Sequence, residues 1–111
     1  MVDAARQELV EVLRQARSLL ALPDNNFDWS SWADADAALR EVDGLVAKVQ
    51  SGQLPERLAI EVLFAPTGPI QETSLSSGWA QEFLALASKC DAAVERVYGK
   101  CSWWRRLLRR S

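Results

Sequence analysis

The sequence predicts an all-α protein, a small antiparallel helical bundle of three long helices and one short helix, with a long loop and a basic helical C-terminal tail. In three long segments, apolar residues recur three and four positions apart, which is the spacing of a helix with one buried face. Prolines and glycines stand at the segment ends. The 111 residues, 49% apolar and 25% charged, have the size and composition of one globular domain with its own core.

The first long helix is expected over residues 3–22. Asp3 can cap its start, and Pro23 closes it. Its inner face consists of Leu9, Val12, Leu13, Ala16, Leu19 and Leu20.

The second long helix is expected over residues 32–50, with Ser31 as its cap and Gly52 as a left-handed exit. Its inner face consists of Leu39, Val42, Leu45, Val46 and Val49. Pro55 suits a first helical position, so residues 55–64 are expected to form the short helix. The alternative of a strand stays open there, because apolar residues also alternate at Ile60, Val62 and Phe64.

Residues 65–77 lack clear periodicity and are rich in proline, glycine and hydroxyl residues, which predicts the long loop. The last long helix is expected over residues 79–98 and ends at Gly99. Ser76-Ser77-Gly78 would then lie at its start, where free backbone N–H groups can hold an anion. No lysine or arginine lies between Arg57 and Lys89 to assist such binding, so capping is the favoured role.

Two segments, residues 27–32 (FDWSSW) and 63–79 (LFAPTGPIQETSLSSGW), resemble those of a family of small bacterial helical proteins. The resemblance extends over residues 24–95 and leaves the basic tail outside. It implies a compact bacterial domain. It brings no assigned activity and no functional residues.

Charge divides the chain into two parts. Residues 1–99 carry 15 acidic and 8 basic side chains, whereas residues 100–111 carry five basic and no acidic ones. We therefore expect a helical bundle domain over residues 1–99 and a basic amphipathic tail over residues 100–111. Between positions 24 and 43, six carboxylates are opposed only by Arg40. Such a stretch repels nucleic acid and attracts a cationic partner.

The candidate partner-binding site combines these carboxylates with nearby tryptophans. Tryptophan is enriched in binding hot spots, although near helix starts it more often fills the edge of a core. The expected partner-binding residues are Asp24, Asp28, Trp29, Trp32, Asp34, Asp36 and Asp43.

The tail is the second candidate site. Drawn as a helix, it segregates apolar residues from arginines. The apolar half contains Trp103, Trp104, Leu107 and Leu108, and the basic half Arg105, Arg106, Arg109 and Arg110. Docking on the acidic body of the chain is favoured, and a partner protein, an anionic membrane surface and nucleic acid are the alternatives.

The sequence does not predict a catalytic or metal-binding site. The chain contains no histidine, the commonest general base near neutral pH and the commonest zinc ligand. Asp34 and Asp36, two positions apart on a helix, would point to different faces. Cys90 and Cys101 have no metal-binding spacing and are too few for a disulfide framework. We therefore expect no enzyme activity, no cofactor and no metal site, and a cytoplasmic location.

The leading hypothesis is a non-enzymatic protein-interaction module whose acidic face binds a cationic protein, as small acidic immunity proteins neutralise basic toxins. This comparison rests on size and charge alone. The first alternative is a peripheral membrane or assembly adaptor that uses the tail. The second, less favoured, is a carboxylate-based enzyme.

Overall fold

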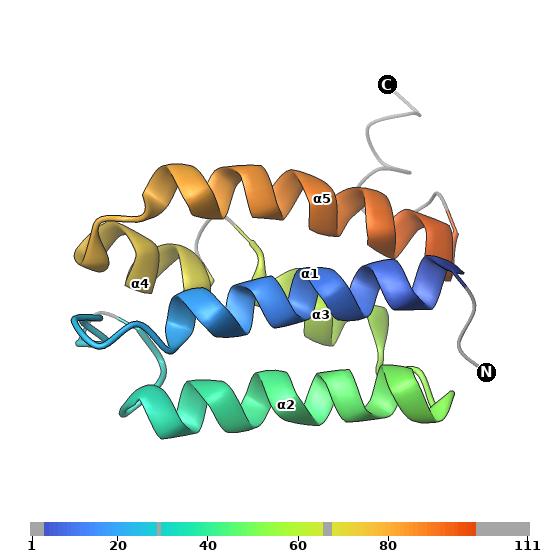
Figure 1. Ribbon diagram of the computed structural model, residues 1–111, viewed down its shortest axis with the longest axis horizontal. Coiled ribbons are helices and arrows are strands. Elements are labelled where there is room, and N and C mark those ends of the chain that lie inside the picture. Colours follow the sequence, from blue (N-terminus) through green and yellow to red (C-terminus); the bar gives the residue numbers. More distant parts are fainter. Residues whose placement is uncertain (1–3, 29, 66–67, 100–111) are drawn as a thin grey trace.

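A computed structural model describes residues 4–28, 30–65 and 68–99 of the chain (Figure 1). Within these ranges the protein is all helical and has no strand, which confirms the predicted fold class for this part of the chain. The tail residues Trp103 to Arg110 lie outside the described ranges. The helices are α1 (Ala4–Leu20), α2 (Ala35–Ser51), α3 (Arg57–Leu63), α4 (Pro69–Ser77) and α5 (Ala80–Tyr98).

Helix α1 lies at the centre of the arrangement. Its largest sets of contacts are with α2 on one side and α5 on the other, and α3 and α4 pack against α5. Figure 1 shows α1 between the other two long helices and running in the opposite direction to both. As a result, α2 and α5 are held apart. The three long helices form one layer, and α3 packs on one side of this layer, between α2 and α5.

The core is built from the apolar stripes that define these helices. Phe83 of α5 is the largest fully buried side chain, and its ring stacks on that of Phe64 with the centroids 6.3 Å apart and the planes 12° apart. Burial of apolar area is the main stabilising contribution in a domain of this size. The other large, fully buried apolar residues are Leu9, Leu13, Leu20, Val42, Val49, Ile60, Leu63, Ile70 and Cys90.

The predicted start of the second helix is wrong by three residues. Helix α2 begins at Ala35, and its cap is Asp34 instead of Ser31: the Asp34 carboxylate accepts a hydrogen bond of 2.9 Å from the backbone N–H of Ala37. The reason is tertiary packing, because Trp32 is only 7% exposed and belongs to the core cluster. The backbone before α2 places this side chain inside instead of forming another helical turn.

The prediction of a loop over residues 65–77 is also wrong, since most of this segment is α4. Pro69 occupies the first turn of α4, and Gly78 ends it in the left-handed conformation. The buried hydroxyl of Thr73 donates to the Pro69 carbonyl at 2.9 Å, and that of Ser74 donates to the Gln71 carbonyl at 2.8 Å. These bonds satisfy polar groups that would otherwise be costly to bury.

Ser76-Ser77-Gly78 consequently lies at the end of α4 instead of the predicted start of the last long helix. At that end the Ser77 hydroxyl accepts a hydrogen bond of 2.9 Å from the Asn26 backbone N–H. The Trp79 indole donates to the Asn25 side-chain carbonyl at 2.8 Å. The junction of α4 and α5 therefore holds the first loop, which connects α1 to α2 over residues 21–34, in place instead of offering an anion site.

The segment after Pro55 is helical, which decides the open choice between helix and strand. Its end is tightly packed on the next element: a Cβ added to Gly68 would lie 2.3 Å from the Val62 carbonyl oxygen. Only glycine allows this close approach of the backbone that leads from α3 into α4. The position of α3 relative to α4 is thus fixed at one end.

Candidate interaction surfaces

The carboxylates of the predicted acidic face divide into separate groups. Asp28 and Asp34 line a shallow depression of about 500 Å³ beside the first loop. Asp24, in the same loop, is also exposed. The Asp28 backbone N–H is held by the Asn26 side chain at 2.9 Å, so this loop has a defined conformation.

Asp36 and Asp43 form a second group on α2. They lie seven residues apart, and both are exposed on the same face of the helix. This face also carries basic groups: Arg17 of α1 donates to Asp43 at 2.6 Å, and the Arg40 side chain donates to the Asp36 carbonyl at 3.4 Å. The hydrogen bond to Asp43, followed by the charge of Asp43, raises the pKa of Arg17. The negative charge of this face is therefore partly offset within the molecule.

The predicted tryptophan that the structure describes, Trp32, does not lie among these carboxylates as an exposed anchor. Trp32 is buried, and Trp29 lies outside the described residues. Trp79, which the sequence also places beside a loop, is buried against the same end of the bundle. For Trp32 and Trp79 the structure shows the role of core-edge packing.

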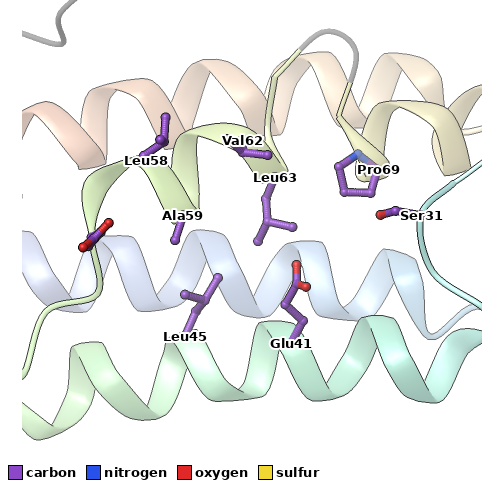
Figure 2. Close-up of a pocket in the computed structure, with 9 residues that line it drawn as sticks. Ser31, Glu41, Leu45, Leu58, Ala59, Val62, Leu63 and Pro69 are labelled. Carbon is purple, nitrogen blue, oxygen red and sulfur yellow. The ribbon is translucent and has the colours of Figure 1, made fainter.

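A groove between α2 and α3 combines apolar surface with acidic residues, and Figure 2 shows it from the α3 side. Its volume is about 560 Å³. Glu41 and Leu45 point toward the groove from α2, while Ala59 and Leu63 point toward it from α3. The full lining consists of Ser31, Glu41, Leu45, Glu56, Leu58, Ala59, Val62, Leu63 and Pro69.

The apolar part of this groove is unusually accessible. Leu58 is 55% exposed and Val62 is 50% exposed, and their spacing of four residues places them on one face of α3. Glu41 and Glu56 are also exposed, and no basic side chain belongs to the lining that the described residues provide. An apolar strip between carboxylates is complementary to a basic amphipathic helix.

The sequence prediction missed this groove. Glu41 is one of the six carboxylates between positions 24 and 43, but its position on α2 turns it toward α3 and away from Asp36 and Asp43. The four-residue spacing of Leu58 and Val62 could have indicated an exposed apolar face on a helix. The sequence did not decide between helix and strand for this segment, so this face was not predicted. A strand would have put Leu58, Val62 and the intervening Ile60 on one face, whereas the helix buries Ile60 and exposes the other two.

The described part of the chain shows no group of three or more metal-binding side chains. Within the same residues, no helix is long and apolar enough to cross a membrane.

Comparison of the chain with protein-family models, curated proteins and solved structures gives no match. The resemblance to small bacterial helical proteins stays a prediction. Function is therefore inferred from the surfaces described above.

Proposed function

We propose that the protein is a non-enzymatic interaction module that binds a basic, amphipathic segment of a partner protein in the α2–α3 groove. The observation that carries this proposal is the presence of half-exposed Leu58 and Val62 between the exposed carboxylates of Glu41 and Glu56. The body over residues 1–99, an antiparallel bundle of three long helices, serves as the rigid support of this surface.

The apolar residues account for affinity in this proposal. Full burial of a leucine or valine side chain contributes about 1.5–3 kcal/mol, so covering the exposed halves of Leu58 and Val62 contributes about 1.5–3 kcal/mol together. The carboxylates set orientation, because a helix with arginines on one side can pair with Glu41 and Glu56 only when its apolar side faces α3.

The remaining acidic residues act at longer range. Asp24, Asp28 and Asp36 are exposed and form no ion pair with any described residue. Their summed field raises the association rate of a basic partner without direct contact. Small acidic immunity proteins offer an analogy for this mode of recognition, based on size and charge.

A calorimetric titration tests the proposal. The probe is a synthetic helical peptide with leucines on one face and arginines on the other. The titrated protein is the full chain carrying Trp104→Ser and Leu107→Ser, which disrupt the apolar half of its own basic segment. Binding is expected, and Val62→Ser in this background is expected to weaken it about tenfold, corresponding to the loss of roughly 1.4 kcal/mol of apolar contact.

Leu84→Ser is the matched control, because Leu84 is 60% exposed but lies on α5, away from the groove lining. It should leave the peptide affinity unchanged. Absence of peptide binding would contradict the proposal. So would equal losses of affinity in the Val62→Ser and Leu84→Ser proteins.

A further inference from the structure

We infer that the basic C-terminal segment of this chain, residues 102–110, occupies the α2–α3 groove and competes there with the partner. This inference rests on the proposed function, since both concern the same groove. It adds a specific occupant and a mode of regulation: the free protein covers its own binding surface.

The end of α5 is bound to the start of α3, close to the groove. The Tyr98 hydroxyl donates to the Pro55 carbonyl at 2.7 Å, and Arg57 donates to the Gly99 carbonyl at 3.0 Å. Both bonds attach the last described residues to the N-terminal end of α3. Glu56, which stands immediately before α3 and lines the groove, is the neighbour of both Pro55 and Arg57. The following residues therefore begin beside the N-terminal end of α3, close in sequence to Glu56.

The remaining length fits the distance to be covered. Twelve residues follow Gly99. Residues 100–102 in extended form would reach about 10 Å from Gly99, whose carbonyl is bound by Arg57, the residue next to Glu56. Residues 103–110 as a helix measure about 12 Å, and the seven-residue α3 that forms one wall measures about 10 Å.

The chemistry of the segment is complementary to the groove. Its apolar half, Trp103, Trp104, Leu107 and Leu108, matches the exposed strip of Leu58 and Val62. Its four arginines match a rim whose charged members are Glu41 and Glu56. A helix this short is marginal alone, so contact with an apolar surface is what would stabilise it.

Covalent attachment makes even a weak contact effective. A segment on a short tether experiences an effective concentration in the millimolar range, so an intrinsic Kd of about 0.1 mM leaves the groove mostly occupied. An external peptide then binds the wild-type chain about tenfold more weakly than it binds the Trp104→Ser, Leu107→Ser chain.

Paramagnetic relaxation locates the segment directly. A nitroxide is attached at position 111 of the full chain carrying Cys101→Ser and Ser111→Cys. The other thiol, Cys90, is buried and its pKa is raised to about 12, so it does not react under the same conditions. We expect strong broadening of the methyl signals of Leu45, Leu58 and Val62, and little broadening for Leu22 and Leu84.

Charge-reversal variants serve as controls for the broadening of the groove methyl signals. Glu41→Lys together with Glu56→Lys should reduce the broadening of the groove methyls severalfold, whereas Asp36→Lys on the other face of α2 should leave it unchanged. Peptide titrations of the wild-type chain and the Trp104→Ser, Leu107→Ser chain should show the tenfold difference.

Three results would overturn the inference: groove methyls that are no more broadened than those of Leu22 and Leu84, broadening that scales with protein concentration, or equal peptide affinities in the two chains. None of these three results would contradict the proposed function, because that function is tested separately by peptide binding to the Trp104→Ser, Leu107→Ser chain. Conversely, absence of peptide binding there, with groove methyls still broadened by the label, would refute the proposed external partner and leave an internal contact.

Discussion

Replacing Phe83 by alanine should lower the free energy of unfolding by about 3–5 kcal/mol, the usual cost of removing a buried aromatic side chain. Phe83 is 1% exposed and stacks on Phe64, so the contact joins α5 to the end of α3. Its loss removes both the buried apolar area and the aromatic contact. The measurement is urea-induced unfolding followed by circular dichroism, with the slope compared between variants to check that unfolding stays two-state.

Leu84→Ala is the control for this experiment. Leu84 is the next residue of α5 but is 60% exposed, so its replacement should cost less than about 1 kcal/mol. Similar losses for the two variants would mean that Phe83 is not buried as described, and that the placement of α3 against α5 is incorrect.

The second large effect concerns the alkaline stability of the protein. Burial, followed by the charges of Asp91 and Glu61, raises the pKa of Cys90 from its ordinary value of 9.0 to about 12. Between these values the unfolded chain has lost the thiol proton and the folded chain has kept it. The unfolded state therefore binds fewer protons, and stability falls as the pH rises from 9 toward 12.

Each unit of pKa difference corresponds to about 1.4 kcal/mol. Between pH 8 and pH 11 the wild-type protein should lose about 3 kcal/mol more than the Cys90→Ala protein. Urea unfolding of both proteins at the two pH values measures this difference directly. The raised pKa of Tyr98 also lowers alkaline stability, but it acts equally in both proteins and cancels. Equal losses would show that Cys90 is accessible to water in the folded state.

The long helices were predictable because their apolar residues repeat at helical spacing. The stripes over residues 3–22, 32–50 and 79–98 correspond to α1, α2 and α5, with boundaries displaced by up to three residues. Helix α4 was not predictable in the same way. Its buried face includes Thr73 and Ser74, whose hydroxyl groups bond to carbonyls of the same helix, so the segment shows no apolar stripe.

The candidate sites were less predictable because they depend on contacts between distant residues. Nothing in the acidic stretch indicates that Asp43 pairs with Arg17, which lies 26 positions earlier. The local sequence likewise does not show that Trp32 enters the core or that Glu41 faces α3. The groove exists because α3 packs against α5 and turns Ala59 and Leu63 toward α2 while Leu58 and Val62 stay exposed at its edge, which is a property of the tertiary arrangement.

The most direct test of the account is a map of where a basic amphipathic peptide binds. Methyl-labelled full-length protein carrying Trp104→Ser and Leu107→Ser is titrated with the peptide, and chemical-shift changes are followed by NMR. We expect the largest changes at Leu45, Leu58 and Val62, which line the α2–α3 groove, and small changes at Leu22, Leu75 and Leu84, which are exposed elsewhere. Largest changes at Leu22, Leu75 or Leu84, with Leu58 and Val62 unaffected, would contradict the assignment of the α2–α3 groove as the binding surface.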